Sequence, residues 1–447
     1  MVIEKDKFVQ TQEGKNLAQM KKPISKIIAA LALVILFSTI NYAQKISAEE
    51  QKIVSYVDEH TSDAIALVEK TVNIESPTEN VAGVKQVGMV FKKEFEAIGF
   101  VAKWIEMPAG MKRAGHLIAE KNGTKGQRVL LLGHLDTVLS GEKFRRDGNK
   151  IYGTGSADMK AGDAVLLYAL KALSATGALQ NARVIVLLTG DEEDSGEPVE
   201  IGRGDMIAAA KRSDLTLSFE NGANNIATIA RRGFSSWELE VSAKTGHSAG
   251  IFKESMGSGA IFEASRIINQ FYETLHNEKY LTFNPSVIGG GTVLESKDGG
   301  VTVTAQGKLN VVPAKVVVRG DLRFISEEQK ETARAKMREI VAKNLPGTTA
   351  RITFTDSNPA MPPTTGNYAL LKQLDQVSQD LGLGKIEPLD PGERGAGDIS
   401  YISHLLPSMD GLGATGGSAH ARGEYAELDT LPTQIKRAAL LIYRLTR

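Results

Sequence analysis

Short apolar runs separated by helical patterns are the feature that most constrains this fold. Three runs predict buried strands: Arg128–Leu132, Ala182–Leu188 and Asp214–Phe219. Apolar residues recur at helical spacing in the segments before and between them: Ile53–Val72, Val87–Ile98 and Asp163–Ala175. Strands that alternate with helices predict parallel pairing and an α/β fold. Because ligands bind at the carboxyl ends of the strands in such sheets, the residues that follow each strand are the candidates for a functional site.

Composition excludes several classes of protein. Lys+Arg and Asp+Glu are equal at 53 each in 447 residues, so the chain lacks the basic excess of a nucleic-acid binder. Apolar residues make up 42% and charged residues 24%, which argues against general disorder and a polytopic membrane protein. The chain has no cysteine, which excludes disulfides, thiolate-bound metals and a thiol nucleophile. Any metal must therefore be held by histidines and carboxylates.

Residues 1–43 are predicted to be a secretory signal peptide. A basic segment precedes the apolar run Ile27–Phe37, and Ala43 supplies a small residue before the cleavage point. The polar stretch before Met20 predicts an N-terminal extension or a translation start at Met20. An uncleaved anchor is the alternative, but this apolar run is shorter than the roughly 20 residues of a membrane span. The sequence predicts export to the periplasm or secretion, with no stable membrane span after cleavage.

Imidazole or carboxylate side chains follow each predicted strand, and two Gly-rich loops add more. The candidates are His134 and Asp136 after the first strand, Asp191, Glu192 and Glu193 after the second, Glu220 after the third, and Asp158 and His420 in the loops. Histidine and carboxylate ligands without thiolate suit zinc or a similar divalent ion. Carboxylates and imidazoles in this number exceed what one tetrahedral ion needs. Two metals that share a bridging carboxylate fit better.

This ordered set resembles the motifs of the co-catalytic zinc exopeptidases, the family of glutamate carboxypeptidase, aminoacylase and related amidohydrolases. The similarity extends from about Ala48 to the C-terminus, and the pattern is most similar to glutamate carboxypeptidases. The resemblance implies a mixed, largely parallel sheet flanked by helices, and two Zn²⁺ per subunit, with other divalent ions possible. The implied metal ligands are His134, Asp158, Glu193, Glu220 and His420.

The resemblance also implies how these ligands divide. His134 and Glu220 are implied to bind one zinc. Glu193 and His420 are implied to bind the other, and Asp158 to bridge both. The family often has a cis peptide bond after the bridging aspartate, here Asp158–Met159.

Two further carboxylates match catalytic positions of the family. Glu192 matches the general base, which takes a proton from the attacking water and passes it to the leaving nitrogen. Two ions that share this water lower its pKa. Adjacent side chains diverge, so the base and the ligand Glu193 are separate glutamates. Asp136 matches the carboxylate that fixes the His134 imidazole.

A second unit is predicted at residues 232–355, inserted between two parts of the catalytic domain, 44–231 and 356–447. Its pattern of β-α-β-β-α-β resembles the family's ferredoxin-like α+β lid and dimerisation domain, which implies a homodimer. His247 matches the family histidine that often reaches the active site of a neighbouring subunit and polarises the substrate carbonyl.

Three residues of the second half of the chain are predicted to bind substrate. Asn310 and Arg323 match substrate-binding positions of the family, and an arginine fork suits a terminal carboxylate. An ordinary surface ion pair is the alternative for Arg323. Gly397 lies in a loop before a predicted helix, where free N–H groups could receive the same carboxylate. Glu220 resembles the carboxypeptidase and deacylase branches, which predicts cleavage of the amide bond before a C-terminal amino acid, in a peptide or N-acyl amino acid.

Other functions stay open on the sequence alone. An N-acyl-amino-acid deacylase or a dipeptidase of the same family is one, and a non-catalytic binding relative is another. A third is a serine hydrolase, in which Gly246–Gly250 forms the nucleophile elbow around Ser248, with Asp398 and His420 downstream. The next helical pattern begins only near Gly257, which is late for such an elbow. The histidines that match no motif are predicted to be surface or packing residues: His60, His116, His276 and His404.

Overall fold

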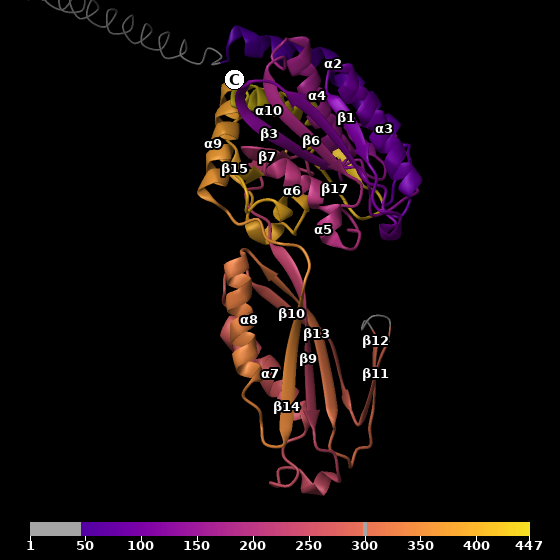
Figure 1. Cartoon of the computed structure of the whole chain (residues 1–447), viewed down its shortest axis with the longest axis vertical. Helices are drawn as coiled ribbons and strands as arrows, with labels where there is room; N and C mark the ends of the chain where they lie inside the picture. Colours follow the sequence, from indigo (N-terminus) through magenta and orange to yellow (C-terminus); the bar gives the residue numbers. More distant parts are fainter. Residues whose placement is uncertain (1–45, 298–301) are drawn as a thin grey trace, which may run out of the picture.

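The computed structural model describes residues 46–297 and 302–447, which form two units. The larger unit contains the beginning and the end of the described chain, and the elongated unit contains its middle (Figure 1). The predicted signal peptide, residues 1–43, lies outside the described residues. Within the described part, every helix is too short or too polar to cross a membrane.

A six-stranded sheet forms the centre of the larger unit, in the order β1-β2-β6-β3-β7-β16. Strand β3 pairs in parallel with β6 and β7, and β16 with β7, whereas β1 and β2 run antiparallel. The predicted mixed, largely parallel sheet is therefore confirmed. The strands are β1 (Val101–Ile105), β2 (His116–Asn122), β3 (Lys125–His134), β6 (Ala182–Thr189), β7 (Leu215–Ser218) and β16 (Ser408–Met409).

Helices cover both faces of this sheet, which explains why its inner strands have continuous apolar sequences. Successive residues of β3 point to opposite faces. Val129 and Leu131 pack into the larger core, while Leu130 and Leu132 pack with α6 and with Ile399. The helices of the larger core are α2 (Ala48–Val72), α3 (Val81–Ala97), α4 (Lys160–Ala175), α9 (Thr365–Asp380) and α10 (Leu431–Leu445). The two short helices are α5 (Val199–Gly202) and α6 (Gly204–Ala210).

Two helices begin earlier than their apolar spacing predicts. Helix α3 begins at Val81, where Asn80 caps it by accepting the N–H of Gly83. Helix α2 begins at Ala48 behind a capping box formed by Ser47 and Glu50. In α2 the polar cap and first turn precede the apolar stripe, so periodicity alone places its start too late.

A small sheet in the order β17-β18-β5-β4 lies beside the central sheet and joins distant parts of the chain. Its strands are β4 (Arg145–Asp147), β5 (Lys150–Tyr152), β17 (Gly416–Gly417) and β18 (Tyr425–Glu427). A separate parallel pair consists of β8 (Ile226–Ala227) and β15 (Glu387–Pro388).

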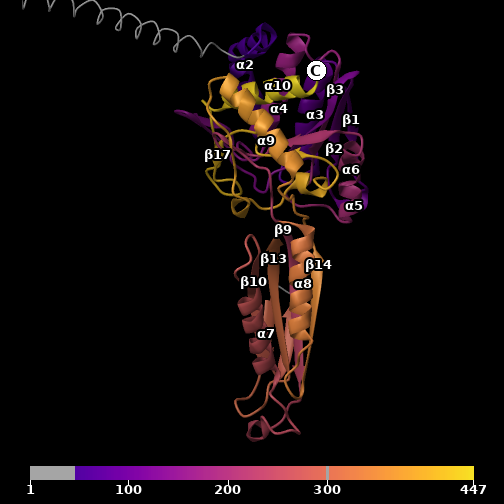
Figure 2. The same cartoon turned by 90° about the vertical axis from the view of Figure 1, so that its left-hand side faces the viewer.

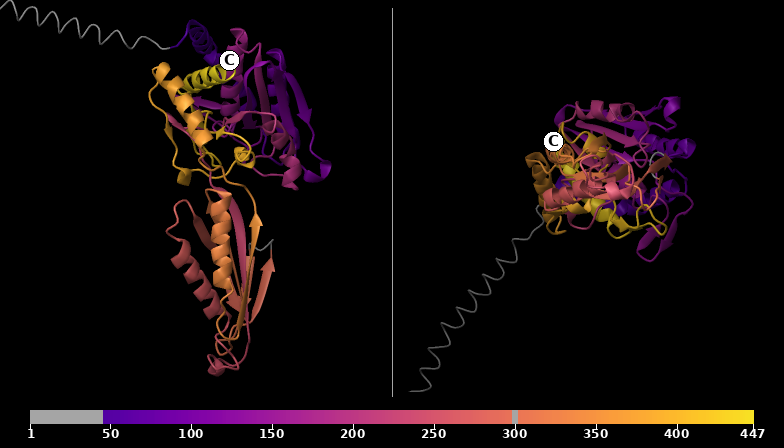
Figure 3. Two further views of the ribbon diagram at one scale, coloured as in Figure 1. Left: turned by 60° about the vertical axis from the view of Figure 1, so that its left-hand side comes forward. Right: turned by 90° about the horizontal axis from the view of Figure 1, so that it is seen from below.

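The elongated unit, called the lid below, has the four-stranded antiparallel sheet β10-β13-β9-β14. Its strands run away from the larger unit along the long axis of the lid (Figure 2). Helices α7 and α8 cover one face of these strands (Figure 3), where the ring of Trp237 meets Phe271 edge-on. The elements are β9 (Gly233–Ala243), α7 (Ala260–Leu275), β10 (Thr282–Gly291), β13 (Lys315–Phe324), α8 (Glu327–Val341) and β14 (Thr348–Asp356).

This order confirms the predicted β-α-β-β-α-β pattern. A hairpin of β11 (Val293–Lys297) and β12 (Thr302–Gln306) is added between β10 and β13. The chain enters and leaves the lid at adjacent points, where Arg231 and Met361 form an antiparallel bridge and the Phe234 N–H donates to the Asn358 carbonyl over 2.9 Å. The lid is therefore held to the larger unit by two neighbouring crossings.

Candidate metal centre and active site

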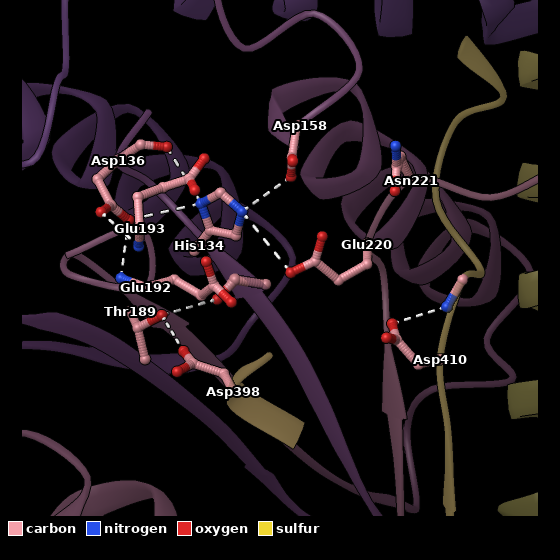
Figure 4. Close-up of polar contacts among 12 residues, drawn as sticks. His134, Asp136, Asp158, Thr189, Glu192, Glu193, Glu220, Asn221, Asp398 and Asp410 are labelled. Carbon is pink, nitrogen blue, oxygen red and sulfur yellow. Dashed lines mark hydrogen bonds and ion pairs between the residues drawn. The ribbon is translucent and has the colours of Figure 1, made fainter. Parts of the chain in front are cut away.

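The carboxyl ends of three neighbouring strands bring most of the candidate residues to one edge of the central sheet (Figure 4). His134 is the last residue of β3, Glu192 and Glu193 follow β6, and Glu220 follows β7. His134 and Glu220 are both buried, at 1% and 6% exposure. The site is thus built into the interior edge of the sheet.

Asp158 lies between two His–Glu pairs. Its Oδ1 is 3.2 Å from His134 Nε2, and that nitrogen is 3.7 Å from Glu220 Oε1. Its Oδ2 is 3.2 Å from His420 Nε2, and that nitrogen is 3.1 Å from Glu193 Oε2. Each oxygen of one carboxylate therefore faces a separate imidazole and a separate glutamate, which is the arrangement that a bridging ligand needs.

The electrostatics of this cluster favour a bound cation. Burial and the charge of Asp158 raise the pKa of Glu220 well above its ordinary value. Burial, with Asp398, Glu193 and Asp158 adding to it, raises the pKa of Glu192 to about 8. Carboxylates crowded in this way are relieved by positive charge.

The donor set fits divalent ions. Two groups of three side chains have their ligand atoms within 4.8 Å of one another: His134 with Asp158 and Glu193, and His134 with Glu192 and Glu220. Only imidazole nitrogens and carboxylate oxygens converge here, as zinc and similar ions require.

Asp136 connects the imidazole of His134 to the loop that carries the glutamates. Its Oδ1 is 3.5 Å from His134 Nδ1, and the same nitrogen is 3.1 Å from the Asp136 carbonyl oxygen. Its carboxylate also accepts the backbone N–H groups of Glu192 and Glu193 over 3.1 Å each, and the Thr78 hydroxyl over 2.7 Å. The structure thus gives Asp136 more contacts than the imidazole contact that the sequence predicts.

A cavity of about 980 Å³ separates this edge from the near end of the lid. Arg323, at the end of β13, lines the lid side, with its guanidinium over the ring of Phe234. Its Nε is 3.1 Å from Asp321 Oδ2, so the predicted alternative of an ion pair is also present. Other lining residues are Glu192, Glu193, Gly395, Tyr401 and His420. The cavity is large enough for a small peptide.

The position of Gly397 differs from the prediction. Gly395 and Ala396 line the cavity, whereas a side chain at Gly397 would meet the Arg231 guanidinium at 2.5 Å. The predicted helix after this loop is only the 3₁₀ turn Asp398–Tyr401. The binding of a substrate carboxylate by Gly397 stays a prediction.

His247 and Asn310 lie at the far end of the lid. His247 follows β9 and pairs with Val311, and both His247 and Asn310 are exposed. Strand β9 has 11 residues and begins beside the larger unit. At about 3.3 Å per residue it separates these two residues from the metal centre of their own chain by roughly 33 Å.

A family model described as peptidase family M20/M25/M40 matches residues 130–444. The chain belongs to this family. It is therefore an M20-type metallohydrolase, and the resemblance predicted from the metal-ligand motifs is confirmed. The cis bond between Asp158 and Met159, implied by the same resemblance, is present.

Curated relatives of the M20 protein include two kinds of amide hydrolase. Carboxypeptidase G2 from Pseudomonas sp. (strain RS-16) is 28% identical, over 85% of this chain and 88% of its own length. Succinyl-diaminopimelate desuccinylase from Nitrosospira multiformis is 25% identical, over 86% of this chain and 97% of its own length.

Solved structures of M20-type proteins share the fold. Aminopeptidase PepT from Bacillus cereus superposes with a TM-score of 0.67 at 18% identity, over 86% of this chain and 98% of that one. The M20 family metallo-carboxypeptidase Sso-CP2 from Sulfolobus solfataricus gives 0.59 at 16% identity, over 85% and 98%.

The serine hydrolase alternative is wrong for this M20 protein. Ser248 lies in the 3₁₀ turn Ser248–Gly250 at the far end of the lid, and the next helix starts only at Ala260. Its proposed partners are at the other end: Asp398 contacts Thr189 and Arg203, and His420 contacts Asp158. No Ser–His–Asp triad can form across that distance.

Arg203 and His116 contact the loop that follows β6 and carries Glu192 and Glu193. The sequence did not predict this supporting role for either residue. Buried Arg203 donates to Asp191 Oδ1 over 2.6 Å, and its Nε lies 2.8 Å from Asp398 Oδ1. His116 is fully buried, where its Nδ1 accepts the Gly190 N–H and its Nε2 contacts the Gly202 carbonyl over 2.7 Å. His116 is thus a packing residue, as predicted, but one that also holds this loop.

Proposed function

We propose that this M20 metallohydrolase is a dinuclear zinc carboxypeptidase that hydrolyses the amide bond before a C-terminal amino acid. The observation that carries the proposal is the cavity with Glu192 and His420 on one wall and Arg323 on the other. A guanidinium across the cavity from the base can bind the substrate carboxylate and place the adjacent amide at the metal centre. The similarity to carboxypeptidase G2 supports the same choice.

His134, Glu220, Glu193 and His420 would hold the two ions, with Asp158 between them. Bound zinc would supply Lewis acidity and lower the pKa of water in the site.

Glu192 would then move the proton. Its backbone N–H donates to Asp136, and Glu192 lines the cavity. As a general base it takes the proton of the attacking water, and as a general acid it gives that proton to the leaving nitrogen. The oxygen of the water stays on the carbonyl carbon, so the products are the free C-terminal amino acid and the shortened peptide, or the carboxylic acid of the acyl group.

A second copy of the chain would complete the site. His247 cannot reach the metal centre of its own chain, so we infer that it donates to the substrate carbonyl in a homodimer. Exposed apolar side chains near the same end of the lid offer a contact surface, with the rings of Phe252 and Phe262 5.5 Å apart. Asn310 lies beside His247 and would bind substrate from the same copy.

An N-acyl-amino-acid deacylase or a dipeptidase is the second candidate. The similarity to succinyl-diaminopimelate desuccinylases favours deacylation, since those proteins are named for removing an acyl group. Both candidates use the same metal centre and differ only in what fills the cavity beyond the scissile bond.

The test is a substrate panel assayed with the predicted mature chain, residues 44–447, with and without chelator. It pairs one blocked acyl or peptidyl group with different C-terminal residues and includes an unblocked dipeptide. Chelator-sensitive cleavage of blocked substrates with a free carboxylate is expected. Cleavage only of unblocked dipeptides would move the protein to the dipeptidase candidate, and activity indifferent to chelator would overturn the metal mechanism.

Export to the periplasm or secretion is a separate proposal that depends on the signal peptide at residues 1–43. N-terminal sequencing of the protein recovered outside the cytoplasm should give Gln44. Recovery of the intact N-terminus only from the cytoplasm would contradict it.

A further inference from the structure

Two loops of the metal centre are joined through the small sheet. The loop Gly153–Asp158 follows β5 and carries the shared carboxylate. The loop of residues 418–424 connects β17 to β18 and carries His420. Strands β5 and β18 pair directly, with Tyr152 opposite Tyr425. Each loop therefore starts or ends at the same point of that sheet.

Glu424 connects the two loops through its side chain as well as its backbone. Its Oε2 accepts the N–H of Gly155 over 2.8 Å. Its Oε1 accepts the N–H groups of Ala157 and Asp158 over 2.7 and 2.9 Å, and its carbonyl oxygen accepts that of Gly153 over 3.1 Å. The Glu424 residue is only 5% exposed. One residue thus satisfies four main-chain donors of a single loop.

Other hydrogen bonds of this loop do not involve the main chain of Asp158: the Thr154 N–H donates to the Glu142 carbonyl over 3.1 Å, and the Lys160 N–H donates to the Gly155 carbonyl over 2.9 Å. Gly153 and Gly155 have φ angles of +139° and +80°, which leave the chain outside helix and strand geometry. Inside the loop, the main-chain N–H of Ser156 donates to the Gly153 carbonyl over 3.0 Å. Because Glu424 accepts the N–H of Asp158 itself, it restrains the main chain from which the shared carboxylate projects.

We propose that Glu424 is a positioning residue of the metal centre, an inference that rests on the proposed metal site. Its carboxylate orients the backbone of Asp158 so that Oδ1 faces His134 and Oδ2 faces His420. His420 is only four residues before Glu424 in the chain. The Glu424 side chain therefore also fixes the separation between the ligands Asp158 and His420. Glu424 binds neither metal nor substrate; it acts through the main chain.

The role differs from that of a residue that only stabilises the fold. A structural residue lowers the melting temperature and leaves the metal affinity of the folded molecules unchanged. A residue that aims a ligand changes the affinity and the coordination geometry, and comparable supporting residues are worth about 10- to 100-fold in metal affinity.

The experiment compares the wild-type protein with Glu424→Gln, Glu424→Asp and the control Glu427→Gln. Gln keeps the shape of the side chain but replaces one acceptor oxygen with a donor, which opposes an N–H of the loop. Asp keeps the charge but is one methylene too short to reach all three amides. Glu427 lies in β18 three residues away and has no amide contact of this kind within the described residues.

Two measurements are made on protein stripped of metal and checked for folding by circular dichroism. The first is the zinc affinity, by competition with a chromophoric chelator. The second is the visible absorption spectrum of the protein loaded with Co²⁺, which reports the coordination geometry. We expect both Glu424 variants to lose about 10- to 100-fold in affinity for at least one ion and to change the cobalt spectrum, with Glu427→Gln unchanged.

Wild-type affinity and spectrum in both folded Glu424 variants would overturn the positioning role alone and leave the metal site standing. A wild-type protein that binds no divalent ion would overturn the proposed metal site and this inference together. Should Glu424→Gln fail to fold, Glu424→Asp decides, because it keeps the buried charge.

Discussion

The edge of the central sheet and the far end of the lid contain similar polar residues in opposite surroundings. At the sheet edge, His134 and Asp136 are buried and contact each other and the glutamate loop. At the far end of the lid, His247 and Asn310 are exposed, and His247 Nδ1 accepts the N–H of Ala249, two residues further along the chain. A buried group is oriented by its own chain. An exposed group at the tip of the lid is accessible to a second molecule.

The largest effect is expected at the sheet edge, where the chain supplies everything for the proton transfer. Glu192→Ala should lower kcat by about 10²- to 10⁴-fold and keep the bound metal, because the general base is lost and the ligands remain. Asp158→Ala should lose both metal and turnover. Steady-state kinetics with metal analysis measures the two effects. A Glu192→Ala protein with normal kcat would remove the assignment of the base.

The next prediction tests how much the buried ion pairs of Arg203 near the sheet edge contribute to stability. Arg203→Met should destabilise the protein by about 3 to 5 kcal/mol, because it leaves Asp191 and Asp398 buried without their cation. Chemical denaturation of the metal-free protein measures this. The control Arg212→Met removes an exposed ion pair with Glu120 and should cost less than about 1 kcal/mol. Equal losses of stability in Arg203→Met and Arg212→Met would contradict the expected difference between a buried and an exposed ion pair.

A substitution at the far end of the lid should lower activity for a different reason, because it removes a proposed contact between two chains. His247→Ala should lower kcat by about 10²- to 10³-fold, the effect of removing one donor to the carbonyl oxygen, with little change in stability. Mixing His247→Ala with Glu192→Ala should restore activity, because a hybrid dimer has one site with Glu192 from one copy and His247 from the other.

Activity assays after mixing and subunit exchange measure this recovery. A mixture as inactive as its components would place His247 outside the site of a second copy. Sedimentation showing only monomers at assay concentration would contradict the dimer itself.

The smallest expected effect is far from both regions, where Glu50 of α2 contacts Arg444 of α10 over 2.7 Å. Burial acts to raise the pKa of Glu50, but hydrogen bonds from Arg444 and Ser47 outweigh it and hold the pKa below its ordinary value of 4.5. The folded state therefore binds this proton more weakly than the unfolded state. The stabilisation is complete above the ordinary pKa and is lost as pH falls through the lowered one.

Glu50→Gln should therefore cost about 1 kcal/mol at pH 7, and the difference from wild type should shrink below about pH 4.5. Denaturation at a series of pH values measures it. A difference that stays constant down to pH 3 would show that the charge of Glu50 is not responsible.

The strands and the sheet edge could be predicted because both depend on local signals. A run such as Ala182–Leu188 is apolar throughout, and parallel pairing then brings the residues after each strand to one edge. The order of the lid elements followed from the same kind of pattern. The assignment of His134 and Glu220 to one ion needed the family resemblance, because spacing alone does not pair residues on different strands.

The supporting residues could not be predicted, because their contacts are not local. Glu424 and Ala157 are 267 positions apart, and nothing in the sequence around Glu424 distinguishes it from the neighbouring Glu427. Arg203 follows a stretch rich in acidic residues and has the appearance of an ordinary surface arginine. The position of Arg231 beside Gly397 could not be predicted for a similar reason, since only the fold brings the two residues together.

The bridge between Arg231 and Met361 has a consequence for how such proteins diversify. Because the two ends of the lid segment lie side by side, the whole segment is a single insertion into the larger unit. Replacing the lid segment with the corresponding segment of a relative requires two junctions in the chain and leaves the strand pairing of the central sheet intact. All five proposed metal ligands lie outside this segment, so exchanging it would change the proposed substrate contacts of Arg323 and His247 and leave the ligand set unchanged.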